Sequence, residues 1–210
     1  MRYEEFKSRL KKFIVFSLED IKKTDPRFYR SRLNEWQGKN YIKKLRRGYY
    51  IFSDIDLDER KIFFIANRIY HPSYVSLESA LSYYNLIPEG VYTITSVSSA
   101  KTFAFKTPVG EFSYRRIKPE LMFGYRLENF NDRSCKIAEI EKAVLDYLYL
   151  NPAIIKEDDF AEWRFNRHEF LARADMKKFH EYASRFKNKR FENRVKLFLN
   201  LIKKSHYAVS

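Results

Sequence analysis

Residues 71–96 read HPSYVSLESALSYYNLIPEGVYTITS, and within this one stretch the pattern changes from helical to extended. Pro72 and Ser73 form a turn signal that ends any preceding helix. Ser76 can cap a new helix, whose apolar residues share one face at helical spacing: Leu77, Ala80, Leu81 and Tyr84. Residues 86–90 break that helix, and alternating β-branched residues from Val91 onward are typical of a strand. The stretch therefore predicts a joint between a helical half and a sheet half of the chain, with no catalytic chemistry.

Upstream of this joint, the sequence predicts three short helices followed by a hairpin. Helical spacing indicates the first over residues 3–13, and Ser17, with an acid three residues later, starts the second. Asp25 and Pro26 are typical of the start of a third helix, which ends at Gly38 and buries Tyr29, Leu33 and Trp36. Strands over residues 41–45 and 49–52 flank a basic tip, Arg46-Arg47-Gly48. This is the order of elements in a winged helix, whose third helix enters the major groove of DNA.

The predicted third helix carries polar residues opposite its apolar side: Arg27, Arg30, Ser31, Asn34 and Gln37. Arginine can donate two hydrogen bonds to guanine, and Asn and Gln can bond adenine in the same way. The hairpin cations are expected to meet phosphates, which position a protein without reading sequence: Lys43, Lys44, Arg46 and Arg47. The alternative is a solvated helix face on a protein-binding winged helix. Duplex DNA is favoured over RNA because no aromatic stacking platform is apparent.

Charge is distributed unevenly along the 210 residues, whose formal net charge is +14. Residues 1–52 contain 15 Lys and Arg against 6 Asp and Glu, and residues 151–210 contain 14 against 8. Residues 53–150, with 12 against 13, are nearly neutral. A strongly basic N-terminal part favours a polyanionic partner. The acidic segment 53–58 (SDIDLD) is interpreted as a linker, which predicts two domains: a head of residues 1–56 and a body of residues 57–210.

For the whole chain we expect the α+β class: a winged-helix head, then a mixed α+β body with a small antiparallel sheet and a helical C-terminal tail. Strands are predicted near residues 102–106, 111–117 and 122–127. Asn151 and Pro152 end a strongly amphipathic helix, and two or three more such helices follow. Four cations on the predicted sheet are either a partner surface or an ordinary charged face: Arg115, Arg116, Lys118 and Arg126.

No pattern in the chain predicts an enzyme or a cofactor. The five glycines form no phosphate-binding loop, and the four histidines stand at no metal-ligand spacing from Cys, Asp or Glu. The single cysteine, Cys135, excludes an internal disulfide and is interpreted as an inert thiol in a reducing compartment. The chain has no apolar run of about 20 residues and no apolar signal at its start, so we expect a cytoplasmic protein without a membrane partner.

The segment PSYVSLESALSYYNLIPE also resembles the signature of the AbiEi-type antitoxins, which are transcriptional regulators of type IV toxin–antitoxin (abortive infection) systems. Three further stretches agree with that family in the same order: Arg46-Arg47-Gly48-Tyr49-Tyr50, Ile65-Ala66-Asn67, and Glu141-Lys142-Ala143 with Asp146. Together these matches cover roughly residues 15–150, and the tail departs from the pattern.

The resemblance implies a head that binds double-stranded DNA at its own operator and represses the operon. It also implies a body that counteracts a nucleotidyltransferase toxin, with no cofactor. Because the tail does not match, the surface that neutralises the toxin is not identified. One alternative is a stand-alone winged-helix transcriptional regulator without a toxin partner. Another, a nucleic-acid-processing enzyme, is disfavoured by the missing carboxylate or histidine groups.

Overall fold

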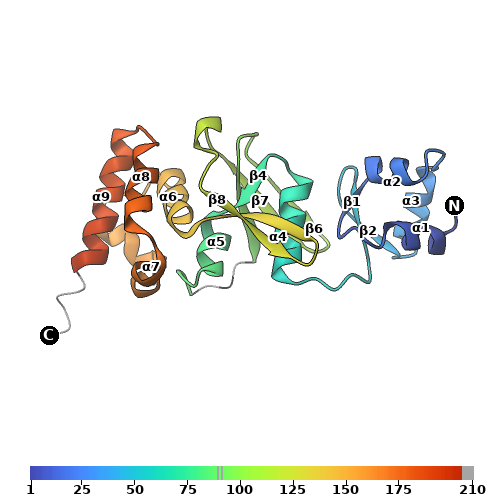
Figure 1. Cartoon of the computed structure of the whole chain (residues 1–210), viewed down its shortest axis with the longest axis horizontal. Helices are drawn as coiled ribbons and strands as arrows, with labels where there is room; N and C mark the ends of the chain where they lie inside the picture. Colours follow the sequence, from blue (N-terminus) through green and yellow to red (C-terminus); the bar gives the residue numbers. More distant parts are fainter. Residues whose placement is uncertain (89, 91, 205–210) are drawn as a thin grey trace.

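In the computed structural model, which describes residues 1–88, 90 and 92–204, the chain extends along one axis (Figure 1). The head lies at one end, with β1 and β2 toward the body and its helices on the outer side. A large sheet occupies the middle, and α6 to α9 stack at the other end. Among the described residues, no helix combines the length and the apolar character needed to span a membrane.

The head consists of short helices and a three-stranded antiparallel sheet in the order β1-β3-β2. Its elements are α1 (Tyr3–Leu10), β1 (Phe16–Ser17), α2 (Leu18–Thr24), α3 (Ser31–Gly38), β2 (Ile42–Arg46) and β3 (Tyr49–Phe52). The predicted cap of the second helix is confirmed, because the Asp20 amide donates to Ser17 Oγ at 3.1 Å and the Ser17 amide donates to Asp20 Oδ2 at 2.8 Å. The predicted hairpin is confirmed as β2 and β3.

The sheet of the body is larger than predicted and is not purely antiparallel. Its elements are α4 (Glu59–Ile69), β4 (Ser73–Val75), α5 (Leu77–Tyr83), β5 (Thr93–Ser98), β6 (Phe103–Thr107), β7 (Gly110–Arg116), the 3-10 turn η1 (Pro119–Leu121), β8 (Tyr125–Phe130) and β9 (Arg133–Ala138). Six strands pair in the order β6-β7-β5-β4-β9-β8, and the pairs β5–β7 and β4–β9 are parallel. The predicted α+β class is confirmed, but the prediction that the body has a small antiparallel sheet was wrong.

Strand β4 explains that error. We interpreted Ser73 as part of a turn, but it opens a strand of three residues that are all buried, so no alternation of polar and apolar residues marks it. This strand joins the two halves of the sheet by pairing with β5 on one side and β9 on the other. The helix predicted after it begins at Leu77 as expected. The predicted strand start at Val91 lies outside the described residues, and β5 begins at Thr93.

Helices complete the C-terminal end of the body. They are α6 (Ile140–Leu150), the 3-10 segment η2 (Glu157–Trp163), α7 (Arg167–Arg173), α8 (Met176–Ser184) and α9 (Lys189–Lys204). Helix α6 stops at Leu150, as the Asn151-Pro152 pair predicts. It packs against α5 on one side and against α8 and α9 on the other, and therefore connects the sheet to the terminal helices.

Two hydrophobic cores form, and they do not divide the chain cleanly. The head core contains Phe6, Leu10, Phe16, Ile21, Leu33, Trp36, Ile42, Tyr50 and Phe52. The body core contains the remaining buried apolar residues, and four of them come from the head: Ile14, Val15, Leu45 and Ile51. One side of the head sheet therefore packs on the body, so the two halves share an apolar contact in addition to the chain connection at residues 53–58.

Candidate nucleic-acid interface

Helix α3 is held in the head by its apolar side. Leu33 and Trp36 are buried, and the Trp36 ring lies 4.5 Å from the ring of Phe6, measured between centroids. At 100° per residue, burial of these two positions directs Ser31, Asn34 and Glu35 outward. All three are exposed. The outer face of α3 therefore presents a hydroxyl, an amide and a carboxylate.

The start of this helix was predicted wrongly. It begins at Ser31, whereas we expected Asp25 to cap it and Pro26 to open it. Asp25 instead ends α2, because its amide donates to the Ile21 carbonyl at 2.8 Å. Its carboxylate then accepts from the Arg27 amide at 3.0 Å, which turns the chain before α3 can begin.

The later start of α3 changes which aromatic ring packs against the head core and where Arg27 and Arg30 lie. Tyr29, predicted to be buried, is 78% exposed, and Phe28 packs against Phe6 in the head core. Arg27 and Arg30 are exposed but precede the helix, with Arg30 as its N-cap residue. These arginines therefore flank the N-terminus of α3, where they add positive charge to the exposed side that carries Ser31 and Asn34.

The other polar residues of α3 are partly engaged within the head. Gln37 is half-buried, and its amide nitrogen donates to the Leu33 carbonyl at 2.8 Å. Glu35 pairs with Arg32 at 3.1 Å and with Lys39 at 2.9 Å, and the Lys39 hydrogen bond in particular holds the pKa of the Glu35 carboxyl below its ordinary value. Sequence reasoning missed Arg32, Glu35 and Lys39, although their spacing of three and four residues is a signal for helical ion pairs.

Two of the four predicted hairpin cations are exposed, and a third is half-buried. Lys44 and Arg47 are exposed, and Lys43 is half-buried. Gly48 closes the turn at φ +86°, a conformation that glycine adopts without steric cost. These side chains lie on the same small domain as α3.

Arg46, the fourth hairpin cation, faces the body. Its Nη1 donates to the Ile69 carbonyl at 2.7 Å. Its guanidinium lies 5.0 Å from the ring centroid of Tyr70, 5.4 Å from that of Phe103 and 5.7 Å from that of Phe105. Such contacts desolvate the cation and restrain it. The structure therefore places Arg46 in the head–body contact and not beside the other hairpin cations.

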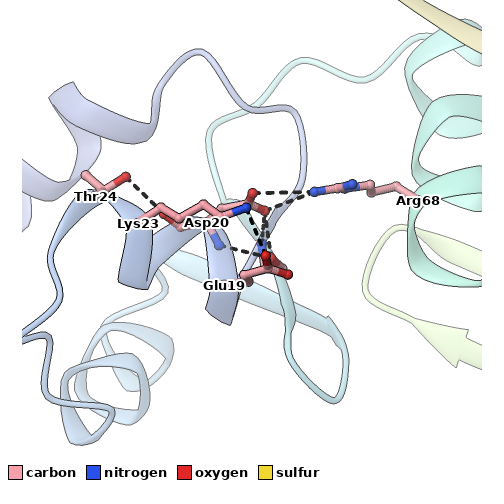
Figure 2. Close-up of polar contacts among 6 residues, drawn as sticks. Glu19, Asp20, Lys23, Thr24 and Arg68 are labelled. Atoms are coloured by element: carbon pink, nitrogen blue, oxygen red, sulfur yellow. Dashed lines mark hydrogen bonds and ion pairs between the residues drawn. The ribbon is translucent and has the colours of Figure 1, made fainter.

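An ion pair also crosses the junction between head and body. Figure 2 shows Arg68 of α4 reaching Asp20 of α2, with Nη2 3.4 Å and 3.3 Å from the two carboxylate oxygens. Burial by itself raises the pKa of Asp20, but the hydrogen bonds from Ser17 and the charge of Arg68 outweigh it and hold that pKa below its ordinary value. Lys7 and Asp54 form a further ion pair at 2.5 Å, which lies within the head and does not cross the junction.

The four cations predicted on the body sheet do not form one cluster. Arg126 lies on β8, which is separated from β7 by three strands, or about 19 Å at ordinary strand spacing. Arg115 donates to Asn151 Oδ1 at 2.9 Å and to the Leu150 carbonyl, so it anchors the end of α6. Arg116 and Lys118 are exposed. The expected grouping was wrong because the strand order of the sheet cannot be read from chain order.

A buried polar cluster lies between the sheet and α6. Lys142 and Asp146 are fully buried and form an ion pair. Tyr74 donates to Asp146 at 2.8 Å, Ser76 donates to Asp146 at 2.9 Å, and the Lys142 ammonium lies 2.9 Å from the Tyr74 hydroxyl. The Ser76 hydroxyl thus donates to Asp146. It makes no side-chain hydrogen bond that caps α5, contrary to our expectation. Burial lowers the pKa of Lys142, although Asp146 opposes that effect.

Other reactive groups are accounted for by packing. Cys135 is buried, and burial raises the pKa of its thiol to about 11, as expected for an inert cysteine. Within the described part of the chain, no group of His, Cys, Asp and Glu is arranged to hold a metal ion.

Comparison of the sequence with protein-family models and with curated proteins found no match.

Proposed function

We propose that this protein is a DNA-binding transcriptional repressor of its own operon and an antitoxin that counteracts a nucleotidyltransferase toxin. The observation that carries the DNA-binding part is the exposed side of α3, where Ser31 and Asn34 stand beside Arg27 and Arg30. An amide and a hydroxyl on an otherwise exposed helix face are groups that read base edges in the major groove. No acid other than Glu35 lies on α3 itself.

The arrangement of the head supports a winged helix. Three helices precede the β2–β3 hairpin, and α3 is packed through Trp36 so that its opposite side faces outward at the end of the molecule (Figure 1). In a winged helix the third helix occupies the major groove and the hairpin rests on the backbone. We assign the phosphate contacts to Lys43, Lys44 and Arg47, and we withdraw Arg46 from that role because it is held by the body.

The antitoxin part rests on the resemblance to the AbiEi-type antitoxins. Two of the matching stretches contact each other in the body, where the hydroxyls of Tyr74 and Ser76 donate to Asp146 at 2.8 and 2.9 Å. Stretches that are far apart in the sequence thus contact each other in the folded body, which supports a fold in common with the AbiEi-type antitoxins. A stand-alone winged-helix regulator without a toxin partner remains the second candidate, because the head alone accounts for the basic N-terminal charge.

Variants of the full chain separate base reading from phosphate contact. Asn34→Ala or Arg30→Ala is expected to reduce the discrimination between operator and unrelated duplex by about 1–3 kcal/mol, because each removes a group that can bond a base edge. Arg47→Ala is expected to weaken both duplexes equally and to lower the slope of log affinity against log salt by about 1. Fluorescence anisotropy on promoter and scrambled duplexes at several salt concentrations measures both quantities. Binding that is independent of salt, or absent at low salt, contradicts the proposal.

Co-expression tests the antitoxin role separately. The proposal requires that a nucleotidyltransferase toxin be encoded beside this chain, and cells that express that toxin are expected to grow when the full chain is also expressed. Asn34→Ala is expected to protect them equally, because toxin control is assigned to the body and not to α3. Growth curves with and without the chain provide the measurement. Failure to protect, with DNA binding intact, would leave the stand-alone regulator as the function.

A further inference from the structure

A cleft of about 440 Å³ opens between η1 and the turn that joins α8 to α9. Both segments lie on the same side of the body, at the top of Figure 1. The cleft is lined by Lys118, Glu120, Leu121, Arg185, Phe186 and Lys187. Leu121 and Phe186 are buried and form its floor, so the accessible groups are three cations and one carboxylate. Two segments distant in sequence therefore converge on a small, positively charged space.

Arg185 is held by stacking and not by an ion pair. Its guanidinium carbon lies 3.6 Å from the ring centroid of Phe123, which covers one face of the group. Stacking leaves the N–H donors at the edge of the guanidinium plane free for a ligand. Within the described ranges, no acidic side chain pairs with Arg185 or with Lys187. Lys118 has only Glu120, at 4.0 Å, and both side chains are about two-thirds exposed, which makes this pair weak.

The buried ion pair of Lys142 and Asp146 lies beneath the floor of the cleft. The Lys142 ammonium lies 5.0 Å from the ring centroid of Phe123 and 5.2 Å from that of Phe186. Burial lowers the pKa of Lys142, pairing with Asp146 opposes that effect, and the charge of Arg185 adds to it. The Phe123 ring thus contacts two cations, of which only Lys142 has a carboxylate partner.

We propose that this cleft binds the phosphate group of a small phosphorylated molecule. A pre-oriented guanidinium offers two parallel N–H donors to phosphate oxygens, and the two lysines add point charges on flexible stems. A phosphate carries more charge than a single carboxylate and can engage all three cations together. The volume lies within the range of small-molecule sites. The two segments that line the cleft, η1 and the turn between α8 and α9, lie away from the head that carries α3 (Figure 1), so the cleft is separate from the proposed DNA-binding face.

Calorimetric titration of the full chain with inorganic pyrophosphate and with adenosine monophosphate, at constant ionic strength, tests the proposal. We expect saturable binding of both, and none of adenosine. Arg185→Gln is expected to weaken binding about tenfold or more, because it removes charge-assisted hydrogen bonds. Lys187→Gln, an exposed position, is expected to weaken binding without affecting the fold. The matched controls Arg190→Gln and Lys177→Gln, exposed cations of α9 and α8 outside the cleft, are expected to bind normally.

Three outcomes would overturn the assignment. The first is no saturable binding of either phosphate compound by the full chain. The second is equal weakening by the cleft variants and their controls, which would indicate a diffuse basic surface. The third is tighter binding of an acidic peptide than of pyrophosphate at the same ionic strength, which would make the cleft a contact for a protein partner. Circular dichroism of each variant distinguishes lost binding from lost folding.

Discussion

Lys142→Met is expected to lower the free energy of unfolding of the body by about 3–5 kcal/mol, because it leaves the Asp146 carboxylate buried without its cation. Asp146 keeps its hydrogen bonds from Tyr74 and Ser76, but neither hydroxyl supplies a positive charge. The loss extends beyond the pair, since Lys142 connects α6 to the sheet through Tyr74. Denaturant unfolding followed by near-ultraviolet circular dichroism, which reports on the packed tyrosines, provides the measurement.

Two further variants identify the cause of that loss. The double variant Lys142→Met with Asp146→Asn is expected to recover most of the lost stability, because the Asn side chain carries no charge while its carbonyl oxygen can still accept from Tyr74 and Ser76. Lys106→Met removes a lysine from the exposed pair with Glu111, which is 2.5 Å long, and is expected to leave stability almost unchanged. A Lys142 variant as stable as the Lys106 variant would show that the buried pair does not hold the body together.

Arg46→Ala is expected to loosen the head from the body, whereas Arg47→Ala is not. Arg46 contributes a charged hydrogen bond to the Ile69 carbonyl and contacts with the rings of Tyr70, Phe103 and Phe105. Losing these contacts is expected to weaken the junction by on the order of 2–3 kcal/mol. Cleavage at residues 53–58 in limited proteolysis and a larger radius of gyration in small-angle X-ray scattering are the expected signs.

DNA binding by the same two variants gives an independent readout. Arg46→Ala is expected to leave the salt dependence of DNA binding unchanged, because its guanidinium faces the body. Arg47→Ala is expected to reduce that dependence, as argued above, without exposing the linker to proteases. If Arg46→Ala lowers the salt slope and leaves the junction intact, Arg46 is a phosphate contact after all, and the head–body contact depends on Asp20, Arg68 and the apolar residues alone.

Features that depend on neighbouring residues were predictable from the sequence. The capping box of Ser17 and Asp20, the hairpin turn at Gly48 and the end of α6 before Asn151 all form as expected. Each is determined by hydrogen bonds or backbone conformations within a few residues, and such preferences can be read along the chain. The concentration of positive charge in residues 1–52 is likewise a property of the sequence itself.

The start of α3 shows where local signals conflict. Asp25 and Pro26 form a good helix start, yet Asp25 also ends α2, and the chain can satisfy only one of these uses. Packing decides between them, because the observed turn packs the half-buried Phe28 against Phe6 and leaves Tyr29 in solvent. A helix that began at Asp25 would have reversed which of these two rings enters the core.

Tertiary structure alone decided which charged residues are available to a partner. Arg46 and Arg47 are adjacent and chemically identical, but one is stacked against rings of the body and the other is exposed. The spacing of Lys142 and Asp146 indicates a helical ion pair, but only the packing of the sheet against α6 buries it. The strand order likewise separates Arg126 from Arg116, and the packing of the C-terminal helices brings Lys118 and Arg185 to the same cleft. These outcomes depend on contacts between segments far apart in the chain, and a side chain's identity and spacing do not encode which distant surface will cover it.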